Sequence, residues 1–349
     1  MGSRAPGYNR RIDRRTRTRD LVTVICLLAA LFGAAAYAFL TRVSNRAAPA
    51  GRTCAYGGDT RSGLRAFDAL VGIHVDCALV FDDAAPNWKA WDDPWFTNNP
   101  IANENWSSFA ADAHNRLIIT VNLFPTPLAA SDPDWRAIGA AGGYTHYARI
   151  LARTLVHDGM GDAVIRLAHE ANGTWYPDNI GSTPAQWRQW REFWRRTVIA
   201  MRSVAGADFD FNWCIAAGYR AIPFADYYPG DDVVDSIGVD VYDVHIPSSA
   251  GDRWSYAYHM AGGVGAIAAF ARRHHKPLTI PEWGLIPRAG GGGGDDPQFV
   301  RGLSRFVERD HVAFQSYFFG ETSATAIEHA PNSVSAYRSA FAAGAGPAG

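Results

Sequence analysis

Short apolar runs alternate with longer amphipathic stretches along most of the chain. The short runs are rich in β-branched and aromatic residues, which is typical of buried strands. They predict eight strands, at residues 54–57, 78–82, 117–124, 163–169, 209–215, 236–242, 278–282 and 313–319. The amphipathic stretches predict helices at residues 62–71, 103–114, 143–157, 184–205, 254–274, 297–309 and 331–343. Only the link between the fifth and sixth strands lacks a convincing helix.

This alternation favours an α/β fold of the (β/α)8 TIM barrel type, which usually takes about 250 residues. A doubly wound sheet fits less well, because no G-x-G-x-x-G follows the first predicted strand. Thr183 and Asp296 each precede a proline and mark helix starts, since a capping side chain is followed by a residue that needs no N–H donor. In such a barrel, functional residues lie at the carboxyl ends of the strands.

The N-terminal part of the chain differs from the rest. Residues 21–40 carry no charge, and twenty helical residues span about 30 Å, the thickness of a bilayer core. Residues 1–20 contain seven Arg and two Asp, a net charge of +5, which leaves −6 for the remainder because the total is −1. The positive segment should stay in the cytoplasm. We therefore expect a cytoplasmic tail, a transmembrane signal-anchor at 21–40 and an extracellular remainder. Secretion after cleavage behind Ala36-Tyr37-Ala38 is the alternative.

The exported part is predicted to comprise a linker at residues 41–52, a barrel domain at 53–343 and a tail at 344–349. Apolar residues make up 48% of the chain, as in folded globular proteins. The near-neutral charge argues against a nucleic-acid partner, which needs a basic face. The glycines at 290–294 predict a flexible loop, since a phosphate loop would require a following Lys-Ser/Thr.

The four cysteines are too few for a domain built on disulfides. Cys26 lies in the predicted membrane segment and Cys214 in the fifth strand. Cys54 and Cys77 begin or precede the first two strands, which are neighbours in a barrel, so an oxidising exterior would allow them to form a disulfide. The sequence leaves both the bonded and the free state open.

No metal or cofactor is expected. His169-Glu170 is not followed by a second His in the H-E-x-x-H spacing of zinc enzymes, and Asp231, Asp232 and Asp235 do not match an EF-hand loop.

Two predicted strands end in a carboxylate. The fourth ends in Arg166-Leu-Ala-His169-Glu170, where the strand period of two places Arg166 and Glu170 on one face, so that the Arg can compensate an inward carboxylate. The seventh ends in Pro281-Glu282-Trp283. These strands lie across a barrel from each other, so Glu170 and Glu282 can face one another over a cleft. Two facing carboxyl groups suit glycoside hydrolysis, and a separation of about 5–5.5 Å predicts retention of configuration. A buried Arg–Glu pair that merely braces the barrel is the structural alternative.

The pattern R-x-x-H-E-x-N-G-x-W-Y from Arg166 onward, with Glu-Trp-Gly at the seventh strand, resembles glycoside hydrolase family 26 of clan A, best known for β-mannanases. Asn212-Trp213 and the segment 235–242 resemble its fifth and sixth strands. Two departures are Ala171, where the family commonly has Met, and an eighth strand ending in Tyr317-Phe318-Phe319 without an obvious Trp.

The resemblance implies Glu170 as acid/base and Glu282 as nucleophile. It also implies that His169 and Trp175 line the reacting-sugar subsite and that Tyr242 hydrogen-bonds the nucleophile. The candidate substrate-binding residues are Arg166, His169, Asn172, Trp175, Tyr242 and Trp283.

Tryptophans are concentrated in two groups. Trp88, Trp91, Trp95 and Trp106 follow the second strand and either line outer sugar subsites or pack in the core. Trp187, Trp190 and Trp194 recur at helical spacing, which predicts core packing.

These observations predict a membrane-tethered retaining hydrolase that cleaves internal linkages of a polysaccharide, with β-1,4-mannan as the first choice. Alternative substrates are another β-glucan, a β-1,3-xylan or a surface polysaccharide of the cell. A non-catalytic envelope polysaccharide-binding barrel and an envelope scaffold or signalling protein are alternatives from other classes. Neither of these needs paired carboxylates at the barrel mouth.

Overall fold

The computed structural model describes residues 51–82, 84–97, 106–220, 222–247, 250–320 and 327–342. The predicted tail 1–20, the membrane segment 21–40, nearly all of the linker and the C-terminal tail lie outside these ranges. Within them, no helix is both long and apolar enough to cross a bilayer.

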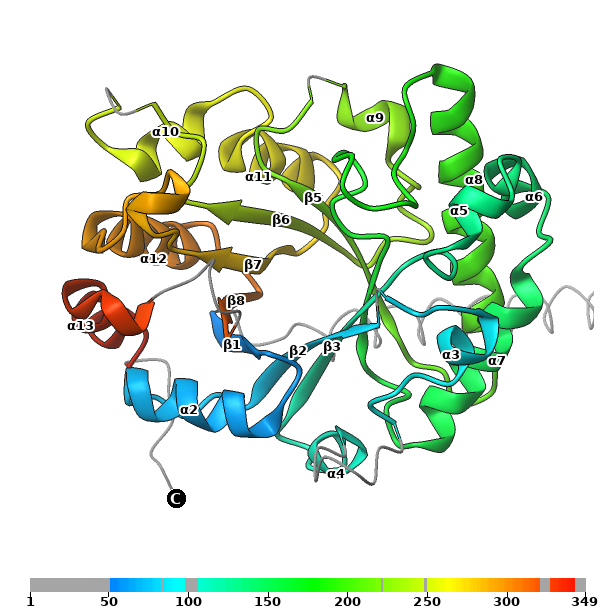
Figure 1. Cartoon of the computed structure of the whole chain (residues 1–349), viewed down its shortest axis with the longest axis horizontal. Coiled ribbons are helices and arrows are strands. Elements are labelled where there is room, and N and C mark those ends of the chain that lie inside the picture. The colour runs from blue at the N-terminus through cyan, green and yellow to red at the C-terminus, as the bar shows by residue number, and fades with distance from the viewer. Residues whose placement is uncertain are drawn as a thin grey trace, which may run out of the picture. The chain divides into compact units, whose positions relative to one another are not determined.

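Eight parallel strands form a closed barrel in which each strand pairs with the next and β8 pairs with β1 (Figure 1). Their bounds are β1 Arg52–Gly57, β2 Cys77–Asp82, β3 Arg116–Val121, β4 Val164–Leu167, β5 Asp210–Ala216, β6 Ser236–Tyr242, β7 Leu278–Gly284 and β8 Phe314–Phe319. The predicted (β/α)8 barrel is thereby confirmed.

Helices surround this barrel (Figure 1). They are α2 Arg61–Val71, α3 Trp88–Asp92, α4 Trp106–Ala110, α5 Leu128–Ser131, α6 Trp135–Ala140, α7 Thr145–His157, α8 Pro184–Arg202, α9 Phe224–Tyr227, α10 Arg253–His259, α11 Val264–Arg273, α12 Pro297–Arg309 and α13 Pro331–Phe341, with short 3-10 turns at Arg288–Gly290 and Ile327–His329.

Helix starts follow the predicted chemistry. Thr183 and Gln186 form a reciprocal capping box at α8, and Asp296 accepts the backbone N–H groups of Gln298 and Phe299 at α12. The link between β5 and β6 holds only the four-residue α9, which is too short to give a helical pattern. The predicted helix at 254–274 is two helices, α10 and α11, separated by the turn around Gly262, whose φ is 68°.

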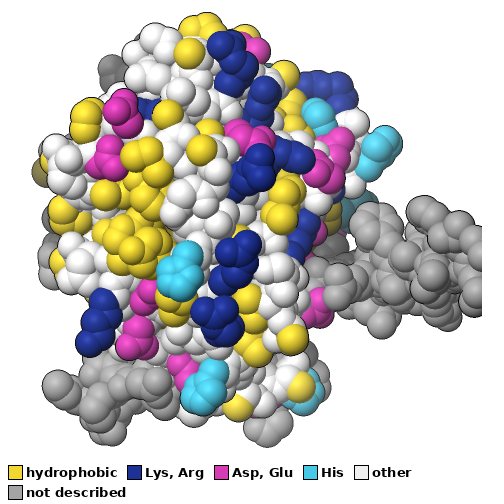
Figure 2. All heavy atoms as spheres, turned by 90° about the vertical axis from the view of Figure 1, so that its right-hand side faces the viewer, with side chains coloured by type: hydrophobic (Ala, Val, Ile, Leu, Met, Phe, Trp, Pro, Cys, Tyr) yellow, Lys and Arg dark blue, Asp and Glu magenta, His cyan; other side chains and the backbone are white. Residues whose placement is uncertain are grey.

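The helices bury their apolar faces against the barrel and leave a mixed polar surface. Figure 2 shows basic and acidic side chains close together on the face that lies at the right of Figure 1. On α8, Arg195 pairs with Asp232 at 2.6 Å and Arg196 with Glu192 at 2.8 Å. Trp190 and Trp194 of the same helix are fully buried, which confirms their predicted place in the core.

The tryptophans that follow β2 were predicted either to line sugar subsites or to pack in the core, and the structure shows both buried and exposed ones. Trp91 and Trp106 are buried, and Trp88 stacks on Tyr147 with ring centroids 4.0 Å apart. Trp95 is 41% exposed, and its indole donates to the carbonyl oxygen of Phe81 at the end of β2. Trp95 is therefore the most exposed of these four tryptophans.

The glycine run at 290–294 lies in the loop after β7, as predicted; its first residues are exposed and its later ones pack closely. The N–H of Gly293 donates to the buried carboxylate of Asp243 at 2.8 Å. A Cβ at Gly292 would overlap the carbonyl oxygen of Ile286. The glycines are needed here because the backbone folds closely upon itself.

Cys54 of β1 and Cys77 of β2 form a disulfide between adjacent strands, with their Cα atoms 4.4 Å apart. The bond closes a loop that contains the first strand–helix unit, since the two residues are separated by 23 positions. Cys214 is a buried free thiol.

We predict that replacing Cys54 and Cys77 together by Ala lowers the free energy of unfolding by about 3 kcal/mol, because the loop is no longer closed in the unfolded chain. Denaturant unfolding of the two proteins measures the difference. Cys214→Ala tests whether loss of a thiol alone has this effect. Alkylation of both Cys54 and Cys77 in the native protein without prior reduction would contradict the bond.

Candidate active site

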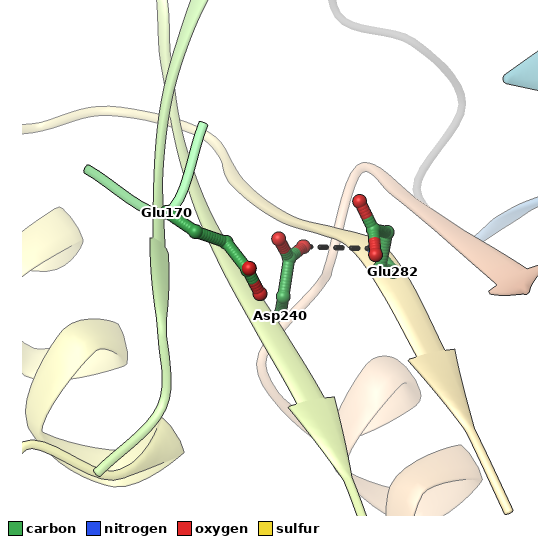
Figure 3. Close-up of side chains that lie close together, drawn as sticks. All are labelled: Glu170, Asp240 and Glu282. Carbon is green, nitrogen blue, oxygen red and sulfur yellow. Dashed lines mark hydrogen bonds between the residues drawn. The ribbon is translucent and has the colours of Figure 1, made fainter. Parts of the chain in front are cut away.

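Three carboxyl groups meet at the carboxyl ends of β4, β6 and β7. They belong to Glu170, Asp240 and Glu282, and one carboxylate oxygen of each lies within 4.8 Å of the others. Figure 3 shows Asp240 between the two glutamates. Glu282 lies at least 42 positions along the chain from each of the other two. The closure of the barrel therefore brings its carboxylate to theirs.

Glu282 is held by hydrogen bonds to both of its carboxylate oxygens. Its side chain is 7% exposed, and Oε1 accepts a hydrogen bond from Nη1 of Arg166. Oε2 accepts one from the hydroxyl of Tyr242 at 2.7 Å. Burial, and then the Glu282 charge, raise the pKa of Tyr242 well above its usual range, so this phenol stays a donor. The hydrogen bond between Tyr242 and Glu282 that the resemblance implies is present, and the role of Glu282 as nucleophile stays a prediction.

Arg166 lies fully buried beneath the carboxylates. Its two terminal nitrogens donate to Glu282 and to Asp240, and Nη1 also donates to the hydroxyl of Thr120 at 3.2 Å. Burial alone would lower the pKa of Arg166, but Asp240 and Glu282 raise it well above its usual range. The sequence predicted that Arg166 compensates Glu170; the direct partners are instead the carboxylates of β6 and β7.

Asp240 is a member of the cluster to which sequence reasoning gave no role. Its Oδ1 accepts the backbone N–H of Glu282 at 3.0 Å, the contact drawn in Figure 3, and the thiol of Cys214 at 3.2 Å. Burial raises the pKa of Asp240 well above its usual range, and the Arg166 charge opposes this rise. A usable signal was present, because Asp240 shares the face of its strand with Tyr242.

The backbone turns sharply before Glu170. β4 ends at Leu167, and both Ala168 and Glu170 have a φ of 49°, which breaks the strand predicted to reach residue 169. The N–H of Glu170 donates to the carbonyl oxygen of Cys214 at 3.0 Å. Its Oε2 accepts the indole N–H of Trp175 at 2.7 Å. Glu170 therefore leaves the strand direction and reaches over the mouth.

Glu170 is the carboxyl group without a direct bond to Arg166. Burial and then repulsion by Glu282 raise its pKa to about 7, while Arg166 and the Trp175 hydrogen bond lower it. A carboxyl group with this pKa holds its proton in neutral solution for part of the time, as a general acid must.

Three predicted substrate-binding residues near Glu170 in sequence have different surroundings. His169 is buried between Phe81 and Tyr176, and burial lowers its pKa well below 6.5, so the ring is neutral. Neither ring nitrogen has a hydrogen-bond partner in the described part of the chain. Asn172 is buried, and its amide bonds the backbone of Ala216 and Tyr219, so it fixes the β4 and β5 loops together. Trp175 is 46% exposed beside Glu170.

Trp283 is not brought to the site. It follows Glu282 in β7 and therefore faces the opposite side of the strand. The indole stacks on Tyr337 of α13 and donates to the side chain of Gln315, and it has no exposed surface. This position corrects the prediction that Trp283 binds substrate.

The cluster of Glu170, Asp240 and Glu282 is also the set of described residues with the geometry to surround a cation. Arg166 already supplies a positive charge to two of its members.

Comparison with known proteins shows what this chain is similar to. Residues 154–268, which include Glu170, Asp240 and Tyr242, match the model of glycosyl hydrolase family 26. The match covers about a third of the chain and agrees with the resemblance that the sequence motifs carry. Endoglucanase H of Acetivibrio thermocellus is 26% identical over 190 residues, which are 52% of this chain and 20% of that protein. The chain thus matches about a fifth of the length of this curated relative.

Several solved structures share the barrel fold of this chain. A GH26 β-mannanase from Bacteroides ovatus superposes with a TM-score of 0.60 at 15% identity, covering 86% of this chain and 89% of that one. An endo-β-1,4-mannanase from Cellulomonas fimi gives 0.58 at 16% identity, covering 82% and 70%. Bacillus subtilis mannanase BCman gives 0.57 at 14% identity, covering 85% and 87%.

We predict that Glu282→Gln lowers the pKa of Glu170 by roughly 1 unit from its value of about 7, because a like charge is removed while burial remains. Carbon-13 NMR of glutamate carboxyl groups, followed against pH, measures this pKa directly. Glu192→Gln, on the outer surface of α8, is the matched control and should leave it unchanged. A Glu170 pKa that stays at about 7 in Glu282→Gln would show that burial alone sets it.

Proposed function

We propose that the protein is a retaining glycoside hydrolase that cleaves internal linkages of a β-1,4-linked polysaccharide, with mannan as the first candidate. The observation that carries the proposal is the approach of the Glu170 and Glu282 carboxyl groups, with oxygens within 4.8 Å. A separation of about 5–5.5 Å between carboxyl groups belongs to double displacement, whereas inversion needs about 6.5–9.5 Å to admit a water.

In the first step, Glu282 attacks the anomeric carbon while Glu170 gives its proton to the leaving oxygen. Arg166 and Tyr242 each bond one oxygen of Glu282, so they fix the direction of the attacking carboxylate. The glycosidic bond breaks, an ester forms between the sugar and Glu282, and the cleaved chain leaves as an alcohol.

In the second step, Glu170 acts as a base. Formation of the ester removes the charge of Glu282, which is the second cause of the raised Glu170 pKa, so the carboxylate form of Glu170 becomes more favourable. It takes a proton from water, the water oxygen attacks the anomeric carbon, and Glu282 leaves as a carboxylate. Two displacements on opposite faces retain the configuration.

The choice of polymer rests on the relatives. The structural neighbours named above are mannanases, whereas the curated relative is an endoglucanase. A β-glucan is therefore the second candidate. The eighth strand does not favour mannan or glucan. Its Phe318 ring stacks on Tyr56, with ring centroids 4.4 Å apart, and so is not a separate aromatic surface for a sugar.

We predict that the protein releases new reducing ends from β-mannan within a panel that also contains mixed-linkage glucan, β-1,3-xylan and envelope polysaccharide. Glu170→Ala should slow hydrolysis by about 10² to 10⁴-fold, since it removes general acid–base catalysis. Glu282→Ala and Glu282→Gln should abolish hydrolysis. The Gln variant keeps the size of the side chain and one acceptor oxygen for Arg166, and its NH2 group can donate to the Tyr242 hydroxyl oxygen, so it controls for loss of folding.

Azide separates the two roles on an aryl β-glycoside with a good leaving group. In Glu170→Ala it should restore turnover and give a β-glycosyl azide, because it replaces water in the second displacement. In Glu282→Ala it should give the α-azide from the opposite face. Proton NMR distinguishes the anomers. Wild-type rates in either Ala variant, or a folded protein that cleaves no polymer of the panel, would refute the proposal.

We further propose that residues 21–40 anchor the enzyme in the cell membrane with the barrel outside, because this charge-free span follows an Arg-rich segment. The full-length protein should sediment with membranes and resist alkaline extraction, while its barrel is digested by protease added to intact cells. A protein released into the medium with an N-terminus just after Ala38 would instead establish the cleaved signal peptide.

A further inference from the structure

We propose that Tyr219, together with the exposed edge of Trp175, forms a subsite for the first sugar of the leaving group. The inference rests on the proposed function. It concerns the loop after β5, to which no role has been given so far, and it names the ligand as a pyranose ring presented by the departing chain.

The direction of the reaction decides which side of the site this is. Glu282 attacks in line with the bond that breaks, so the leaving oxygen lies on the far side of the anomeric carbon from Glu282. Glu170 must lie beside that oxygen to protonate it. Side chains in contact with Glu170, on the side away from Glu282, therefore border the leaving group.

Trp175 contacts the acid, since its indole N–H donates to Oε2 of Glu170 at 2.7 Å. The resemblance implies that Trp175 lines the reacting-sugar subsite. Its exposed edge continues from there to the loop after β5, a strand that β6 separates from the β7 strand of Glu282. A Cβ at Gly173 would lie 2.5 Å from the indole ring, so the absence of a side chain there lets Trp175 lie back over its own loop. Tyr219 meets the indole edge to face, with ring centroids 4.4 Å apart and planes at 70°. The two rings thus form one aromatic surface that begins at the Glu170 carboxyl group.

Tyr219 is exposed although its backbone is firmly held. Its carbonyl oxygen accepts a hydrogen bond from the side chain of the buried Asn172. The backbone N–H groups of Ala217 and Gly218 donate to the backbone carbonyl oxygens of Asp240 and Gly262 at 2.9 and 2.8 Å. Arg220 donates to the carbonyl oxygen of Gly181 at 3.0 Å. The Tyr219 side chain itself remains 39% exposed.

The backbone of this turn is held by hydrogen bonds while its aromatic ring is exposed to solvent. Such a ring is preorganised for a ligand, because little conformational freedom is lost on binding. Aromatic faces pack against the apolar C–H face of a sugar, and the phenol offers a hydrogen bond at its rim. Thr174 lies 3.4 Å from the Tyr219 hydroxyl, at the same edge. The loop therefore supplies a contact for a sugar ring and none of the groups that react.

The test compares two substrates with the same sugar on the attacked side. β-1,4-Mannohexaose carries sugars into the proposed subsite, whereas 2,4-dinitrophenyl β-mannobioside carries only an activated phenol there. Cello-oligosaccharide equivalents replace them if the wild-type enzyme cleaves glucan. Tyr219→Ala should lower kcat/KM about 10-fold on the hexaose, chiefly through KM, and change it less than twofold on the aryl glycoside. Tyr219→Phe should keep most of the hexaose activity.

Tyr256 of α10, which is 37% exposed, is the matched control, and Tyr256→Ala should affect neither substrate. A second readout is transfer of the glycosyl group to added mannobiose. There the acceptor hydroxyl attacks the anomeric carbon, Glu170 takes its proton and Glu282 leaves, so Tyr219→Ala should lower the ratio of transfer to hydrolysis.

Equal losses on both substrates, or no loss on the hexaose, would overturn the subsite while leaving the hydrolase intact. A folded wild-type protein that cleaves neither substrate in either sugar series would overturn the proposed function, and the subsite with it.

Discussion

The site depends on one buried cation. Arg166 has no exposed surface and donates to Glu282 and Asp240, so the guanidinium occupies the centre of the barrel beneath its mouth. A buried charge of this kind is tolerated only when partners and hydrogen bonds compensate its lost hydration. The barrel provides them from β3, β6 and β7, through Thr120, Asp240 and Glu282, and these bonds tie the three strands to Arg166 of β4.

The same cation compensates the three carboxyl groups unequally. Three carboxyl groups lie within reach of one another, and a single guanidinium cannot compensate three charges in a buried place. Glu282 and Asp240 hold the direct bonds, and Glu170 has none. Burial and the charge of Glu282 raise the pKa of Glu170 to about 7, and burial also raises the pKa of Asp240 well above its usual range. The cluster therefore holds protons more readily than free carboxyl groups do, and Glu170 is the member that can pass one on without breaking a bond to Arg166.

Much of this arrangement could be predicted from the sequence, for physical reasons. Hydrophobic runs of strand length recur eight times, and a closed parallel barrel places every strand end at one face. Glu170 and Glu282 were therefore visible as strand-end carboxylates. Trp283 was misplaced because the alternation of the strand was not carried one residue beyond Glu282, although that residue must face the helices.

Other features could not be read in this way. The left-handed backbone at Ala168 and Glu170 depends on the hydrogen bond from Glu170 to β5, a contact between distant segments. The partners of Arg166 depend on which inward side chains meet across the barrel. The alternation along a strand shows which face a residue is on, but not how far along the barrel axis it lies. The packed glycine loop is similar, because the buried Asp243 that organises it lies 50 positions before Gly293.

The two halves of the site are built under different constraints. Glu282, Asp240 and Arg166 are buried and bonded to one another, so a change in any one leaves an uncompensated charge, which costs several kcal/mol. Trp175 and Tyr219 lie on loops and contact the cluster only through Glu170 and through Asn172, whose bonds are to backbone atoms. Side chains on those loops can change while the backbone bonds persist. The barrel can therefore keep one charge arrangement while the loops after β4 and β5 adapt to different leaving groups, which places the chemistry in the strands and the selectivity in the loops.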